Sequence, residues 1–162
     1  MSTRYAYITG FIIISFLVAF SLYVELHDGF TPCPLCILQR LTFCLLAVLF
    51  FFGMMLPVKS FFRFIVPILS ILTSLLGMLL AGRQIWLQNF PPANGECGVT
   101  IQYMIQVLPL SNVIQKVFSG TAECTQRGWI FLSFSMAEWA LVCFTLFLFF
   151  TIYLFVKEWK RG

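Results

Sequence analysis

Four long, strongly apolar segments dominate this sequence and constrain its fold more than any other feature. They cover about residues 6–25, 38–57, 64–84 and 136–156, and charged residues occur only near their ends. A hydrocarbon core about 30 Å thick needs about 20 apolar residues per helical crossing. We therefore predict one all-α integral-membrane domain over residues 1–162, a bundle of four transmembrane helices.

The composition excludes several other classes of protein. Of the 162 residues, 60% are hydrophobic and only 10% are charged, whereas ordinary soluble domains contain about 45–50% apolar and about 25% charged residues. Too few polar side chains remain to cover a soluble surface. A soluble enzyme, a disordered chain and a nucleic-acid binder are therefore poor interpretations, and membrane lipid is the expected environment.

The basic residues indicate an orientation in the membrane. Six of them fall on one side of the predicted crossings, at the two termini and in the loop at 58–63, and these are Arg4, Lys59, Arg63, Lys157, Lys160 and Arg161. Only four fall on the other side, in or beside the loops at 26–37 and 85–135. Because cytoplasmic segments are enriched in lysine and arginine, we expect cytoplasmic termini and two extracytoplasmic loops. The first segment is longer than a typical signal-peptide core and no small-residue cleavage site follows it, so we expect it to remain as a crossing.

The last crossing has a recognisable start. Ser135 is followed three residues later by Glu138 and then by an uninterrupted apolar run. This spacing is the capping-box pattern, in which the two side chains bond the free backbone N–H groups of the first turn. The sequence predicts that a helix begins directly after Ser135.

Four of the six cysteines lie in the segments assigned outside the cytoplasm, namely Cys33, Cys36, Cys97 and Cys124. Thiols are driven toward disulfides in such compartments, and four cysteines allow three pairings. The spacing does not match the paired motifs of a zinc site, so no metal is expected. Cys44 and Cys143 lie inside predicted crossings and are interpreted as small apolar packing residues.

Cys33 and Cys36 form a C-x-x-C motif at the start of the second helix. A helix N-terminus favours a thiolate, which makes the sulfur a better leaving group or electron donor. Arg40 follows Cys36 by one helical turn and shares its face. A charged side chain at membrane depth is a functional candidate. Arg40 either stabilises a thiolate or an acceptor's oxygen anion, or else extends to the lipid headgroups.

The second outer loop contains a short amphipathic pattern. Leu110, Val113, Ile114, Val117 and Phe118 recur at helical spacing, with polar residues between them. Such a stripe predicts a short surface helix between Cys97 and Cys124 that lies on the membrane, although it would equally suit a helix that covers the bundle core.

Together these motifs resemble the disulfide bond formation protein B (DsbB) family. The resemblance rests on PCPLCILQR at 32–40, RQIWLQ at 83–88, the cysteines that flank LPL at 108–110, and Trp129 before the last helix. It covers nearly the whole chain in order. It implies a multi-pass protein of the bacterial inner membrane that reoxidises a periplasmic DsbA-type thiol oxidase and passes the electrons to a membrane quinone, either ubiquinone or menaquinone.

The resemblance also implies a role for each cysteine. Cys97 would form a mixed disulfide with the partner, Cys124 would attack Cys33, and Cys36 as a thiolate would reduce the quinone. Arg40 matches the arginine beside the quinone. Some family members place a histidine near the quinone where this chain has Gln84 or Arg83, so the resemblance implies these two residues as quinone contacts.

Two alternatives remain open at this stage. A quinone-linked thiol oxidase similar to vitamin K epoxide reductase would carry its redox C-x-x-C late in the chain rather than at the second helix. A small four-helix membrane transporter or structural protein would use the outer disulfides only to brace its loops. The predicted crossings contain no acidic residue at mid-depth, which disfavours a proton- or cation-coupled transporter.

Overall fold

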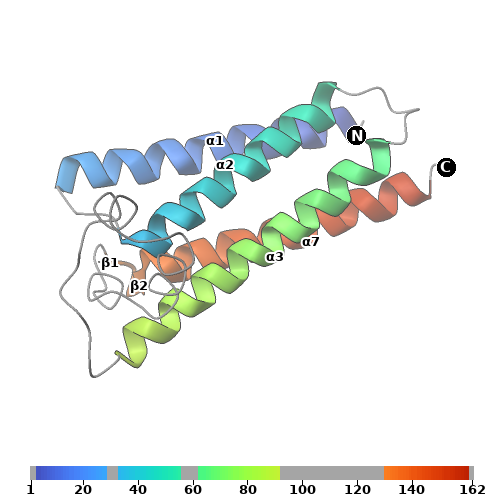
Figure 1. Ribbon diagram of the computed structural model, residues 1–162. Coiled ribbons are helices and arrows are strands. Elements are labelled where there is room, and N and C mark those ends of the chain that lie inside the picture. The colour runs from blue at the N-terminus through green and yellow to red at the C-terminus, as the bar shows by residue number, and fades with distance from the viewer. Residues whose placement is uncertain (1–2, 29–32, 56–61, 92–129, 161–162) are drawn as a thin grey trace, which may run out of the picture.

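Four long helices make up most of the computed structural model, which describes residues 3–28, 33–55, 62–91 and 130–160 (Figure 1). The helices are α1 (Thr3–Asp28), α2 (Pro34–Met55), α3 (Phe62–Asn89) and α7 (Met136–Trp159), and a short hairpin of β1 (Ile130–Phe131) and β2 (Phe134–Ser135) precedes α7. The predicted four-helix membrane architecture is confirmed, since each helix is long and apolar enough to cross a bilayer.

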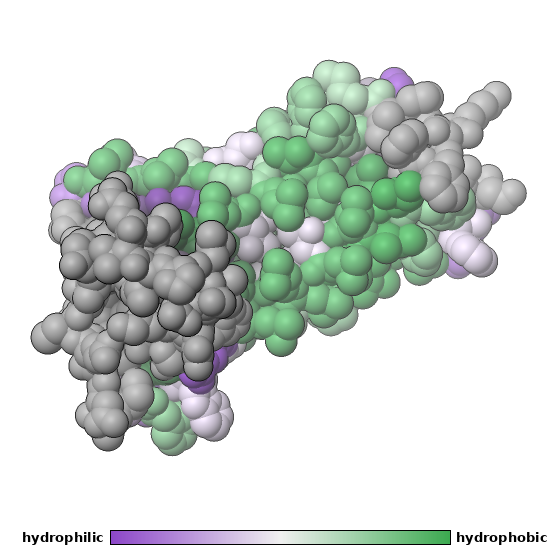
Figure 2. All heavy atoms as spheres, viewed as in Figure 1, coloured by the Kyte–Doolittle hydropathy of each residue, from purple (hydrophilic) through white to green (hydrophobic). Residues whose placement is uncertain are grey.

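The exterior of the bundle is apolar, as a lipid environment requires. Figure 2 shows hydrophobic side chains over the middle of the visible face and hydrophilic ones toward its ends. Large side chains such as Phe16, Leu79 and Phe149 are more than 60% exposed. Because water would penalise such a surface, these helices fit a multi-pass membrane protein.

The helices run alternately up and down. α2 packs against both α1 and α3, and α3 packs against α7. The chain termini lie together at one end of the bundle, whereas the start of α2, the end of α3 and the β1–β2 hairpin lie at the opposite end (Figure 1). That second end, which also holds Cys33, is called the cysteine end below.

Aromatic rings fill the core where helices approach most closely. Phe50 and Phe144 are fully buried. Phe144 stacks on Phe43 with ring centroids 3.9 Å apart, and Phe50 meets Tyr7 edge to face at 5.5 Å. A Cβ atom at Gly77 would clash with the Phe144 ring, so glycine there permits the close approach of α3 and α7.

The predicted capping box at the start of α7 is confirmed. Ser135 Oγ accepts a hydrogen bond from the Glu138 backbone N–H, and the Glu138 carboxylate accepts one from the Ser135 backbone N–H. Before it, Leu132 and Ser133 both adopt positive φ, as the two-residue turn of a tight hairpin requires. Ser135 Oγ also donates to Gln88 Oε1 at 3.0 Å, which ties the start of α7 to the end of α3.

All four helices extend beyond the crossings predicted from the sequence. α1 continues to Asp28, α2 begins at Pro34 and α3 continues to Asn89, so these three reach further toward the cysteine end. The amphipathic segment around residues 110–118, Cys97, Cys124 and most of the loop at 58–63 lie outside the described residues.

Candidate functional site

Cys33 caps the N-terminus of α2. Its sulfur accepts a hydrogen bond from the Cys36 backbone N–H at 3.2 Å, and its carbonyl oxygen accepts one from Ile37 N–H at 3.1 Å. The first helical residue is Pro34, whose fixed φ suits this position and whose missing N–H costs nothing there. The P-C-P-L-C sequence therefore places one sulfur at the positive end of a helix dipole.

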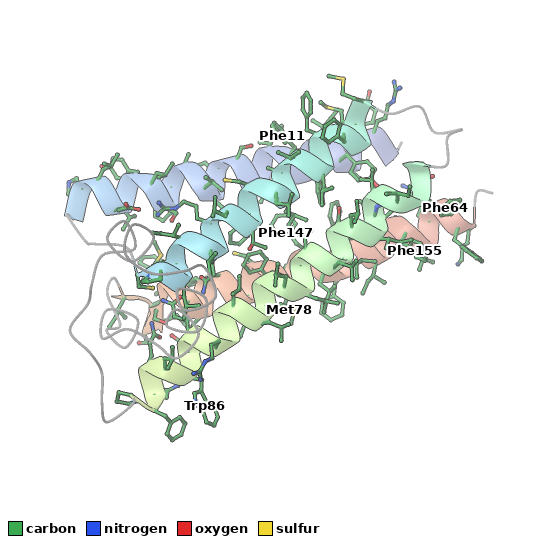
Figure 3. All side chains as sticks on the ribbon, viewed as in Figure 1. Phe11, Phe64, Met78, Trp86, Phe147 and Phe155 are labelled. Atoms are coloured by element: carbon green, nitrogen blue, oxygen red, sulfur yellow. The ribbon has the colours of Figure 1, made fainter. Side chains whose placement is uncertain are left out.

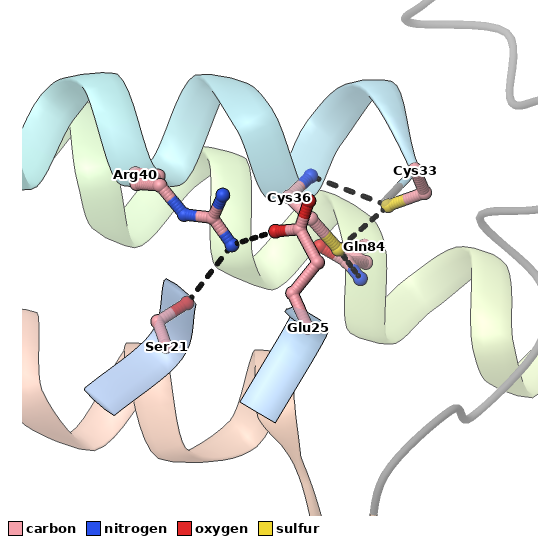
Figure 4. Close-up of polar contacts among 6 residues, drawn as sticks. All are labelled: Ser21, Glu25, Cys33, Cys36, Arg40 and Gln84. Atoms are coloured by element: carbon pink, nitrogen blue, oxygen red, sulfur yellow. Dashed lines mark hydrogen bonds and ion pairs between the residues drawn. The ribbon is translucent and has the colours of Figure 1, made fainter. Parts of the chain in front are cut away.

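The two sulfur atoms of the motif lie side by side. Cys33 Sγ is 2.7 Å from Cys36 Sγ and donates a hydrogen bond to it (Figure 4). This separation is longer than the roughly 2.05 Å of an S–S bond. Cys33 is 4% exposed and Cys36 is partly buried.

Gln84 on α3 reaches across the bundle to the same sulfur. Its Nε2 donates a hydrogen bond to Cys36 Sγ at 3.0 Å, and its side chain is 3% exposed. The sequence pointed to this residue as a quinone contact. The structure shows that Gln84 contacts the redox motif itself.

Gln39 is a part of the site that sequence reasoning missed. It lies one turn after Cys36 on α2, is 6% exposed, and donates from Nε2 to Gln84 Oε1 at 2.8 Å. A signal was present in the sequence, because residues three apart share a helix face and Gln39 is a polar residue near the start of an apolar run.

Arg40 is held by α1. Its Nη2 forms an ion pair with Glu25 Oε2 at 2.5 Å and donates to Ser21 Oγ at 3.1 Å (Figure 4). The side chains of Arg40 and Glu25 are only 20% and 25% exposed. The pairing between helices argues against an arginine that extends to the headgroups, which was one of the two readings from sequence. Neither Glu25 nor Ser21 was expected as a partner.

Arg83 and Trp86 lie near Gln84 in the sequence but on other faces of α3. Successive helical residues point about 100° apart, and the hydrogen bonds that join Gln39, Gln84 and Cys36 do not include Arg83, which is partly buried. Trp86 is 58% exposed and projects away from the bundle (Figure 3). The structure therefore brings together Cys33, Cys36 and Gln84.

The remaining cysteines separate into two sets. Cys44 is exposed on the outer face of α2 and Cys143 is half-buried on α7, and neither belongs to the group around Cys36. Cys97 and Cys124 lie outside the described residues. No cluster of three or more metal-ligating side chains occurs in the part of the chain that the structure describes.

The arrangement suits thiol–disulfide chemistry. Cys36 Sγ receives two donors, the Cys33 thiol and the Gln84 amide. Hydrogen bonds to the charged form of a group favour that form, so Cys36 is the sulfur better able to carry negative charge. A short sulfur-to-sulfur distance on a fixed helix start also lets the pair alternate between dithiol and disulfide with little backbone movement.

Comparison with known proteins agrees with this chemistry. The family model described as "Disulfide bond formation protein DsbB" matches residues 3–154. A protein named "Disulfide bond formation protein B" from Aromatoleum aromaticum is 35% identical over 162 residues, which cover 99% of this chain and 96% of that protein. Proteins of the same name from an Azoarcus species and from Methylococcus capsulatus are 38% and 34% identical, covering 79% and 88% of this chain and 77% and 88% of their own lengths.

Proposed function

The chain belongs to the disulfide bond formation protein B (DsbB) family, and from this premise we propose that it reoxidises a periplasmic DsbA-type thiol oxidase and delivers the electrons to a membrane quinone. Family membership by itself gives a thiol oxidoreductase role in disulfide formation. The partner, the electron acceptor and the roles of individual residues form the proposal.

The observation that carries the proposal is the environment of Cys36. Its sulfur lies beside Cys33 Sγ at the start of a membrane helix and accepts a hydrogen bond from a buried glutamine of a second helix. A cysteine with a purely structural role needs no such donor. This environment supports Cys33 and Cys36 as a redox pair and argues against the alternative of a transporter or structural protein with inert, disulfide-braced loops.

The proposed relay uses four thiol–disulfide exchanges. The partner's thiolate attacks Cys97 of a Cys97–Cys124 disulfide, which forms a mixed disulfide and releases Cys124 as a thiolate. The partner's second thiolate then resolves the mixed disulfide, so the partner leaves oxidised and Cys97 leaves reduced. Cys124 attacks Cys33 of a Cys33–Cys36 disulfide, which releases Cys36 as a thiolate, and Cys97 then closes the loop disulfide by displacing Cys33. Each exchange breaks one S–S bond and forms another.

Arg40 supports a quinone site beside the pair. Within the described residues, its Nε–H is buried and has no hydrogen-bond acceptor, although buried donors normally have one. A quinone carbonyl oxygen would satisfy it, and Gln84 on α3 has a second amide N–H besides the one that it donates to Cys36 Sγ. The acceptor, ubiquinone or menaquinone, supplies a two-electron sink when bound. Arg83, which precedes Gln84 on α3, is kept in the proposal as a second quinone contact from that helix.

The proposed function also requires a particular membrane and orientation. We place the protein in the bacterial inner membrane, with both termini in the cytoplasm and the cysteine end toward the periplasm. The excess of lysine and arginine at the end that carries the termini supports this orientation. The two thiol pairs then face the oxidising compartment, where disulfides persist.

The proposal is tested by quinone absorbance during addition of a reduced thioredoxin-fold oxidase to the purified protein. We expect turnover in the wild type and less than 1% of it in each of Cys33→Ser, Cys36→Ser, Cys97→Ser and Cys124→Ser. The matched controls Cys44→Ala and Cys143→Ala replace cysteines outside the site and are expected to keep full turnover. Undiminished turnover in any of the four serine variants would overturn the assigned relay.

The order of exchange has its own experiment. A partner variant that keeps only its attacking cysteine can open the Cys97–Cys124 disulfide and release the Cys124 thiolate, but it has no second thiol to resolve the product, so the mixed disulfide should accumulate through Cys97. A covalent adduct resolved on a non-reducing gel and mapped to Cys97 is the expected result. An adduct mapped to Cys33 or Cys36 would show that the partner meets the membrane pair directly.

A further inference from the structure

Two buried amides connect α2 and α3 at the redox pair. Gln39 Nε2 donates to Gln84 Oε1 at 2.8 Å, and Gln84 Nε2 donates to Cys36 Sγ at 3.0 Å. The side chains are 6% and 3% exposed, so water competes little for these bonds. The two glutamines and the sulfur form a continuous chain of hydrogen bonds (Figure 4 shows its Gln84–Cys36 end).

The direction of this chain matters because an amide has two different ends. A glutamine side chain donates from its NH₂ group and accepts at its oxygen. A thiolate only accepts, so Gln84 must turn its NH₂ group toward Cys36 to stabilise the charge. Its oxygen then faces Gln39, and a donor at that position is needed to keep the oxygen there.

We infer that Gln39 is a positioning residue: its amide fixes the orientation of Gln84, so that Gln84 donates to Cys36 Sγ and stabilises the Cys36 thiolate. The inference rests on the proposed function, in which Cys36 is the thiolate beside the quinone. The Gln39 amide donates to Gln84 Oε1, so Gln39 acts on the sulfur through Gln84. The proton released from the Cys36 thiol passes to water.

Other groups around the pair also affect the Cys36 charge. Cys33, directly before α2, donates its thiol hydrogen to Cys36 at 2.7 Å, and Arg40 lies one turn after Cys36 on α2. The other charged groups are Glu25 on α1, which pairs with Arg40, and Arg83 on α3, which precedes Gln84. Because substitutions at Gln39 leave these groups in place, their contribution cancels when variants are compared in one background.

The test measures the pH dependence of Cys36 alkylation by iodoacetamide in purified full-length protein that contains neither quinone nor partner. A background with Cys33→Ser and the other cysteines replaced leaves Cys36 as the only thiol and keeps a donor at residue 33. The variants are Gln39→Leu, Gln84→Leu and the pair together. Thr42→Val is the matched control, because Thr42 is a buried polar residue of α2 that bonds only its own helix, at Leu38 O.

We expect Gln84→Leu to move the midpoint of alkylation about one to two pH units upward, the size expected for loss of a hydrogen bond to a charged group. Gln39→Leu should move it upward by at least half as much, and Thr42→Val should leave it unchanged. In the Gln84→Leu background, Gln39→Leu should add no further shift, because Gln39 has no other route to the sulfur.

The inference would be overturned if Gln39→Leu left the alkylation midpoint unchanged. It would also be overturned if Gln39→Leu shifted the midpoint equally with Gln84 present and in the Gln84→Leu background. Circular dichroism of each variant shows that the bundle is intact before the comparison is made. Since the measurement uses no quinone, a negative result leaves the electron relay standing, whereas failure of the quinone assay leaves the role of Gln39 intact.

Discussion

The Arg40 guanidinium on α2 and the Glu25 carboxylate on α1 form an ion pair at the cysteine end of the bundle, with Nη2 and Oε2 2.5 Å apart. Both side chains are largely buried, and Ser21 adds a second contact from α1. The pair fixes the guanidinium beside the redox motif and at the same time reduces the net charge there to zero. Glu25 is therefore the group that makes an arginine acceptable at this depth.

Loss of either partner of this ion pair should destabilise the bundle. We predict that Glu25→Gln and Arg40→Met each lower the free energy of unfolding by about 1–3 kcal/mol, between the values for exposed and fully buried pairs. The double variant should lose less than the sum, because it leaves no unpaired charge. The free energy of unfolding is measured in mixed detergent micelles for the wild type, the two single variants and the double variant. Strict additivity would show that the two charges do not interact.

Gly77 should tolerate no larger side chain. A Cβ atom there would clash with the Phe144 ring, which is itself fully buried. We predict that Gly77→Ala destabilises the protein by about 1–3 kcal/mol through overpacking between α3 and α7. Gly82→Ala is the control on the same helix, because a Cβ atom there meets nothing within 4 Å. Equal stability of the two variants would contradict the close packing seen here.

Ser135 should matter both for the start of α7 and for its link to α3. Ser135→Ala removes the acceptor for Glu138 N–H and the donor to Gln88 Oε1. We predict a loss of about 1–2 kcal/mol in the free energy of unfolding. Ser135→Asp keeps the cap but not the donor and should recover part of the loss. If Ser135→Ala unfolds like the wild type, the cap contributes nothing to the bundle.

Replacing Gln84 by histidine should change the pH dependence of Cys36 alkylation. An amide does not titrate, whereas an imidazole has an ordinary pKa of about 6.5. In Gln84→His, protonation below that pH would place a cation beside Cys36 Sγ and favour its thiolate. We therefore predict that Cys36 alkylation in Gln84→His persists to lower pH than in the wild type. A profile that coincides with that of the wild type would show that residue 84 has no electrostatic access to the sulfur.

The sequence predicted the elements of the fold well and the contacts between them poorly. The length of each apolar segment is enough to predict four crossings, and the Ser135 capping box is a local signal that the structure confirms. The C-x-x-C motif at the start of α2 is local too, since Cys33 and Cys36 are neighbours on one turn.

Contacts between helices have no such local signal. The partnership of Arg40 with Glu25 and that of Gln39 with Gln84 depend on which faces α1, α2 and α3 turn toward one another. In membranes that choice depends on packing and polar contacts across helices rather than on an apolar stripe, because every face is apolar. The same limit explains why Arg83 and Gln84 could not be separated from sequence, although they point to different faces.

The most direct test of the electron relay is its stoichiometry. Purified protein, a reduced DsbA-type oxidase in excess and a known amount of quinone are mixed without oxygen, and partner thiols and quinol are counted together. The protein's own two disulfides can oxidise at most two partner molecules for each protein molecule without forming quinol. Beyond that amount, the relay predicts one quinol for every partner disulfide, since each carries two electrons, and no further partner oxidation once the quinone is spent. Further partner disulfides that form without an equal amount of quinol would contradict it.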